Sequence, residues 1–177
     1  TGLVVNYDTR DKIFYPSEGV YAETVVFFNN EFFGSDFNYS KFIFDGSAYF
    51  KNKWEHILAI NLYAEMTAGA PPFNQLSLLG GTKRMRGYFE GALRDKQYVT
   101  FQAEYRFPLF WRFGGVIFGG YGMVGDDFGN VELDDLKYTI GAGLRFLLDE
   151  KQKVNFRFDA GFGKNTSGLY VTVSEAF

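Results

Sequence analysis

The feature that most constrains this fold is the alternation of apolar and polar residues at every second position, which recurs along the chain. The C-terminal segment, residues 169–177, places Leu169, Val171 and Val173 on one parity and ends on the aromatic residue Phe177. Successive side chains of a strand point to opposite faces, so each such strand has one apolar face and one polar face. This pattern is typical of a transmembrane β-barrel with lipid outside and a polar lumen inside.

Nine segments have strand character, and several run to ten or more residues, as a tilted membrane strand requires. Strands of soluble sandwiches are shorter, typically ~5–6 residues. The basic residues Arg106, Lys137, Arg145 and Arg157 all fall on the polar parity. This placement avoids a cost of about 2–4 kcal/mol for each basic residue facing lipid at mid-bilayer. The nine segments are 2–8, 19–29, 37–50, 56–68, 97–107, 112–124, 136–147, 153–162 and 168–177.

Composition narrows the class further. A chain of 177 residues predicts one domain, here 1–177, and no apolar run approaches the ~18 residues of a membrane helix. Cysteine is absent, which excludes disulfides and thiolate metal sites. The net charge of −3 argues against nucleic acid as a partner. No phosphate loop or metal-ligand cluster is evident, so we expect no metal and no cofactor.

The connections predict about eight membrane strands in an antiparallel barrel. Short connections at 51–55, 108–111 and 149–152 alternate with longer ones at 29–36, 69–96 and 125–135. Bacterial barrels have short periplasmic turns, longer outer loops and an even strand number. On that topology the segment 2–8 would start outside the cell. Either residues 1–18 form a non-membrane or partial leading strand, or strands upstream are missing and this is the C-terminal part of a larger barrel.

The long connection 69–96 carries a family resemblance. Its residues 80–89 contain Arg86-Gly87-Tyr88, preceded by Gly80-Gly81. This resembles the Arg-Gly-Phe/Tyr signature of the bacterial surface-antigen superfamily, which includes BamA, TamA and two-partner-secretion transporters. Segments 6–19, 103–108 and 116–125 resemble neighbouring strands of that family, so the resemblance covers essentially the whole chain. It corresponds to the C-terminal half of the family barrel and implies a long extracellular loop folded into the lumen.

The resemblance also implies partners for the loop motif. In the family the loop arginine pairs with acidic residues on the two following strands; Glu104 matches the first, whereas the second falls near Gly120, where no carboxylate stands. A buried Arg86 needs a partner in any case, because an unpaired charge away from water is costly. Glu104 is the best-placed candidate and Asp159 is another. Glycines on the polar parity would leave room for the loop: Gly114, Gly120, Gly122, Gly141, Gly143 and Gly161.

The family implies a non-enzymatic protein of the bacterial outer membrane. Larger relatives insert or translocate proteins, using POTRA modules and a weak seam between the first and last strands. This chain has no room for POTRA modules, so we expect a minimal barrel with an accessory or structural role in outer-membrane biogenesis. Expected partners are outer-membrane lipid and outer-membrane protein clients, with a homodimer through strand edges left open. The seam residues are Leu169, Val171, Val173 and Phe177 on the last strand.

Two other functions stay open. A narrow pore or lipid-binding barrel would use the charged lumen, although charges of both signs favour a cross-paired ionic plug. A membrane-embedded lipid enzyme would need an activated serine beside a histidine and a carboxylate. The only histidine, His56, lies at a short turn beside Trp54 and Glu55. There an interfacial polar role is favoured over that of a general base.

Overall fold

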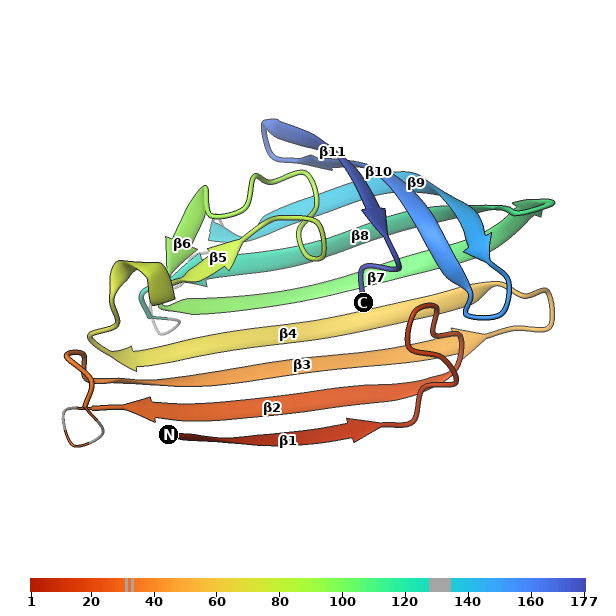
Figure 1. Cartoon of the computed structure of the whole chain (residues 1–177). Coiled ribbons are helices and arrows are strands. Elements are labelled where there is room, and N and C mark those ends of the chain that lie inside the picture. Colours follow the sequence, from red (N-terminus) through yellow and green to blue (C-terminus); the bar gives the residue numbers. More distant parts are fainter. Residues whose placement is uncertain (31, 33, 128–134) are drawn as a thin grey trace.

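The chain folds into one long antiparallel sheet, described in this computed structural model for residues 1–30, 32, 34–127 and 135–177. Nine strands lie in the order β1-β2-β3-β4-β7-β8-β9-β10-β11, so neighbours in the sequence are neighbours in the sheet (Figure 1). The strands are β1 (Gly2–Asp8), β2 (Gly19–Asn29), β3 (Tyr39–Lys51), β4 (Ile57–Gly69), β7 (Gln97–Phe110), β8 (Phe113–Gly125), β9 (Lys137–Asp149), β10 (Val154–Gly163) and β11 (Thr166–Val173).

The predicted class is confirmed: the fold is all-β and antiparallel. The strand count and closure differ from the expectation. β1 pairs with β2 from Gly2↔Phe27 to Asp8↔Tyr21, so the leading segment is a ninth strand of the sheet rather than a separate element. The expected closed barrel of about eight strands is therefore replaced by nine strands in an open sheet. Within the described part of the chain, β1 and β11 form the two edges of this sheet and are not paired with each other.

The connection between β4 and β7 contains structure that the sequence did not predict. A 3₁₀ turn (η2, Phe73–Gln75) precedes β5 (Ser77–Leu79), which pairs with β6 (Leu93–Asp95). Figure 1 shows this segment lying within the curl of the large sheet. The predicted long connections 29–36 and 125–135 lie partly outside the described residues, which exclude 31, 33 and 128–134. No helix in the described ranges is long and apolar enough to cross a membrane.

The two faces of the sheet have inverted polarity relative to a soluble protein. Along β4 and β7, Asn61, Gln102 and Glu104 are buried, whereas Leu62 and Phe101 are exposed. Leu62 and Phe101 are direct cross-strand partners, so they form part of one continuous apolar surface. The alternation predicted this division, because period two assigns neighbouring side chains to opposite faces. Such an apolar face requires lipid or another apolar partner. Exposed residues of this face include Leu58, Met66, Tyr105, Ile117, Tyr121, Tyr138, Ile140, Leu144, Phe158 and Phe162.

Candidate functional site

The loop between β5 and β6 folds into a tight turn that presents one arginine to the sheet. Met85 and Gly87 have positive φ values of 50° and 111°, and the N–H of Tyr88 donates to the carbonyl of Met85 at 3.2 Å. The N–H of Gly81 donates to the carbonyl of Tyr88 at 3.2 Å. These bonds close the turn over residues 81–88 and fix the direction of Arg86 at its tip.

Arg86 lies at the centre of the polar face, with 1% of its surface exposed. Its guanidinium forms ion pairs with Glu104 on β7 and with Asp159 on β10, the latter at 2.5 Å. The guanidinium carbon lies 3.5 Å from the ring centroid of Phe118 on β8. Asp159 thus supplies the second carboxylate that no residue near Gly120 provides. One side chain of the loop therefore joins three strands of the sheet.

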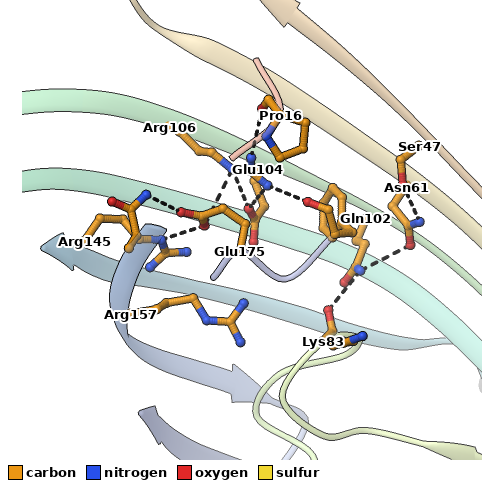
Figure 2. Close-up of polar contacts among 12 residues, drawn as sticks. Pro16, Ser47, Asn61, Lys83, Gln102, Glu104, Arg106, Arg145, Arg157 and Glu175 are labelled. Carbon is orange, nitrogen blue, oxygen red and sulfur yellow. Dashed lines mark hydrogen bonds and ion pairs between the residues drawn. The ribbon is translucent and has the colours of Figure 1, made fainter. Parts of the chain in front are cut away.

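The cluster continues beyond Arg86 into a network of buried charges. Arg106 pairs with Glu104 at 2.8 Å, and Arg145 pairs with Asp159 at 2.5 Å. Arg157 lies 3.4 Å from Asp159. Figure 2 shows Arg106 and Arg145 converging on Glu175, which comes from the C-terminal tail. Each carboxylate of the network is shared by at least two arginines, so the group behaves as one electrostatic unit.

The C-terminal tail takes part in this network, which corrects the predicted seam. We expected the last strand to reach Phe177, but β11 ends at Val173, where Ser174 turns the chain with φ 70°. Glu175 then accepts from Arg145 Nε at 2.7 Å, and the carbonyl of Phe177 accepts from Arg106 at 3.1 Å. Residues 175–177 therefore lie against the charged cluster rather than on the strand edge. The other seam residues, Leu169, Val171 and Val173, are on β11 and exposed.

The backbone of the loop lies directly against the backbone of β10, and this contact holds the motif in place. A Cβ on Gly87 would lie 2.8 Å from the Phe162 nitrogen, and a Cβ on Gly161 would lie 2.6 Å from the Arg86 carbonyl. The N–H of Gly87 donates to the hydroxyl of Tyr170 at 2.8 Å. Tyr88 donates its hydroxyl to the carbonyl of Tyr138 at 3.1 Å. The loop is thus held through its backbone as well as by the arginine.

The arrangement around His56 differs from a catalytic one. Its Nδ1 lies 2.6 Å from the hydroxyl of Tyr105, and its ring packs against Tyr105 and Phe107. In the part of the chain that the structure describes, neither a serine nor a carboxylate hydrogen-bonds to this ring. The same described ranges contain no cluster of three or more histidine or acidic residues able to hold a metal ion. The chemistry that the arginine cluster can perform is electrostatic: it anchors the loop and the tail to the sheet.

Several members of the cluster were not singled out from the sequence. Parity placed Arg145 and Arg157 on the polar face, but parity alone does not assign a partner to either of them. The sequence does not identify Glu175, because the apolar–polar alternation of the last segment continues without a break toward Phe177. The sequence indicates only that Phe118 is an aromatic residue on the inward face, and it does not indicate the contact with Arg86. These contacts join residues far apart in sequence, so only the fold brings them together.

The geometry agrees with what the comparisons show. A family model described as the Omp85 superfamily domain matches residues 1–174. No curated protein matches. A solved structure with this fold is the crystal structure of BamA from Haemophilus ducreyi lacking POTRA domains 1–3, at 15% identity and a TM-score of 0.77. The match covers 98% of this chain but 41% of that one. The family match confirms the resemblance seen at Arg86-Gly87-Tyr88: the chain belongs to the Omp85 superfamily and is a β-barrel protein of the bacterial outer membrane.

Proposed function

We propose that this chain serves outer-membrane biogenesis by offering a rigid sheet whose exposed edge assists the assembly of other outer-membrane proteins. The observation that supports this most directly is the fully buried Arg86, bridged to Glu104 and Asp159. In this proposal the long loop is extracellular and the short turns are periplasmic. Outer-membrane lipid covers the apolar face, and clients meet the sheet at its edge. The role is that of a minimal, accessory, non-enzymatic barrel.

The edge strand β11 has unpaired backbone groups at defined positions. The N–H of Ser174 donates to the carbonyl of Asn155 at 2.8 Å, which assigns the even-numbered residues of β11 to the pairing with β10. In an antiparallel ladder this pairing alternates, so the N–H groups of Leu169, Val171 and Val173 point to the free edge. An exposed edge of this kind pairs readily with another strand. These three residues are therefore the proposed contact for a client strand.

The ionic cluster gives this edge its support. Asp159 lies on β10, directly across from Tyr170 of β11, and is held by Arg86, Arg145 and Arg157. The hydroxyl of Tyr170 accepts a hydrogen bond from the N–H of Gly87 in the loop, so the edge strand is also bound to the loop motif. A template must keep its register while a client pairs with it, and a satisfied buried network restrains register in this way.

The test is assisted folding of a small outer-membrane β-barrel protein into vesicles that contain the full chain. Folding is read from the altered gel mobility of the client without heating. We expect the chain to accelerate folding and Val171→Pro to abolish the acceleration, because proline removes the free-edge N–H while the bonds to β10 stay. Val171→Thr, which keeps that N–H, is the matched control and is expected to stay active. Equal activity of the proline and threonine variants would refute the edge mechanism.

A further inference from the structure

A groove crosses the end of the sheet that carries the short turns 52–56, 111–112 and 150–153. Its cavity volume is about 200 Å³, which is below the ~300–1,000 Å³ of drug-sized sites and limits the occupant to a small group. One part of its wall is apolar and aromatic and includes Phe107, Trp111 and Phe113. The other part is cationic. Its charged lining consists of Lys12, Lys51, Arg106, Arg112, Arg145, Lys153 and one carboxylate, Glu55.

Four of the six cations are already neutralised, and one of them, Arg145, pairs with both Asp159 and Glu175. Lys51 pairs with Glu55 at 2.7 Å, Arg112 with Glu150 at 2.6 Å, and Arg106 with Glu104 at 2.8 Å. Lys12 and Lys153 form no salt bridge with any described residue. The groove therefore carries an excess of positive charge in its lining that the protein itself leaves unbalanced.

A buried donor in the same lining also lacks an acceptor. Arg145 is 3% exposed and uses its Nε on Glu175 and its Nη1 on Asp159. Its Nη2 is buried and has no hydrogen-bond partner among the described residues. The buried Nη2 therefore adds to the positive charge of the lining, although it is closed to a ligand in the groove.

The loop 9–18 positions Lys12 beside the groove. Asp11 accepts from the N–H and the hydroxyl of Ser17 at 2.8 and 2.6 Å, which closes the loop. Tyr15 lines the groove from this loop, and burial raises the pKa of its hydroxyl to about 12. Tyr15 is therefore neutral at physiological pH and adds no negative charge to the groove.

We propose that this groove binds the phosphate headgroup of an anionic phospholipid in the adjacent leaflet. Lys12 and Lys153 would contact the phosphate, and the aromatic wall would contact the glycerol and the start of the acyl chains. Trp111 is exposed at a turn and packs against Phe113 and Phe146, as aromatic residues do at a membrane interface. Basic groups at a membrane surface favour anionic over zwitterionic lipid. This site does not depend on the proposed assembly role.

The experiment titrates the full chain in detergent micelles with short-chain phosphatidylglycerol, with phosphatidylcholine of the same chain length, or with inorganic phosphate. Bound lipid is counted by native mass spectrometry. We expect phosphatidylglycerol to bind about tenfold more tightly than phosphatidylcholine. The double variant Lys12→Gln/Lys153→Gln should lose that preference. Lys83→Gln/Lys164→Gln is the control, because it removes the same charge from two residues that do not line this groove.

Two outcomes would overturn the proposal. The first is equal binding of the two lipids, or an equal loss in the control variant, because either shows that general charge rather than this groove sets binding. The second is competition by inorganic phosphate as strong as that by phosphatidylglycerol, which shows an anion site with no need for lipid. Both double variants change exposed or half-buried side chains, and their unheated gel mobility verifies that they fold.

Discussion

At the scale of single residues, the buried cluster is unbalanced in charge. Among the described side chains it holds four arginines, Arg86, Arg106, Arg145 and Arg157, against three side-chain carboxylates, Glu104, Asp159 and Glu175. Loss of one arginine leaves three charges of each sign. Loss of one carboxylate leaves four positive charges against two negative ones. The two kinds of substitution should therefore differ in cost although they break the same ion pair.

The first prediction compares Arg86→Gln with Glu104→Gln. Arg86→Gln is expected to lower the free energy of unfolding by about 1–2 kcal/mol, because Arg106 and Arg145 still neutralise the carboxylates. Glu104→Gln is expected to cost about 3–5 kcal/mol, because it leaves arginines buried without compensation. Urea unfolding in detergent measures both, with Lys164→Gln as an exposed control. The opposite ranking would show that the cluster is not governed by its charge balance.

The second prediction concerns Asp11 and pH. Burial raises the pKa of Asp11, but hydrogen bonds from Ser17 and Glu18 outweigh burial and hold that pKa below its ordinary value. The stabilisation by the carboxylate is therefore present above the ordinary pKa and is lost as the pH falls through the lowered one. Asp11→Asn is expected to cost about 0.5–1 kcal/mol at pH 7, because solvent screens this exposed carboxylate, and almost nothing once the pH lies below the lowered pKa. A cost that does not change with pH would contradict the role given to the carboxylate.

At the scale of elements, the position of the loop depends on a glycine of β10, Gly161, whose missing side chain leaves room for the loop backbone. The Cβ of an alanine at Gly161 would meet backbone atoms of Arg86 and Gly87 at 2.6–2.8 Å, and backbone cannot move aside as a flexible side chain does. At Gly119 on β8 the nearest atom would be 3.4 Å away. The same substitution should therefore displace the loop at one position and be tolerated at the other.

The third prediction follows from this contrast. Gly161→Ala is expected to expose the loop, so that trypsin cleaves after Lys83, Arg84 or Arg86 at least about tenfold faster, as local opening permits. Gly119→Ala is expected to be cleaved at the wild-type rate. Cleavage is followed by mass spectrometry of the folded protein in detergent. Unchanged cleavage of the Gly161 variant would mean that the loop does not rely on this contact.

The limits of sequence reasoning are clearest at this scale. All nine strands of the large sheet begin within two residues of the predicted start, because period two persists wherever one face meets lipid. The end of β11 was not predicted, because the alternation of Tyr170, Val171 and Thr172 gives no sign of the turn at Ser174. That turn follows from the pairing of Glu175 with Arg145, thirty positions away. β5 and β6, of three residues each, are too short to show periodicity.

The same contrast holds for the candidate site. Glu104 was identified from the strand next to the motif, and its contact with Arg86 needs only strand order and parity. Asp159 was one candidate among several inward carboxylates, and its selection depends on how strongly the sheet curls. Curvature arises from twist summed over many strands, which a sequence pattern does not express. The ion-pair partners that face each other across the lumen, such as Arg86 and Asp159, are therefore set by the fold and not by their spacing in the sequence.

At the scale of the whole molecule, the open sheet needs further strands. Unpaired backbone groups are costly in lipid, so membrane sheets close. Because nine is odd, β1 and β11 run in the same direction. A second copy with the same orientation in the membrane would therefore meet β11 with its β1 in a parallel pair. Two such seams would pair all four free edges, so a client strand would have to displace the β1 of the second copy to reach β11.

The last prediction is that the 177-residue chain, expressed alone, forms a dimer through these seams. The N–H of Phe28 donates to the carbonyl of Thr1, so the even-numbered residues of β1, including Val4, point to its free edge. Each seam uses one β1 and one β11, so Val4→Pro or Val171→Pro alone should convert the dimer to a monomer. Val4→Thr and Val171→Thr retain the N–H and should stay dimeric. Native mass spectrometry in detergent reads the result. A stable, folded wild-type monomer would show that the edges need no second copy, because the isolated sheet then satisfies them by closing on itself.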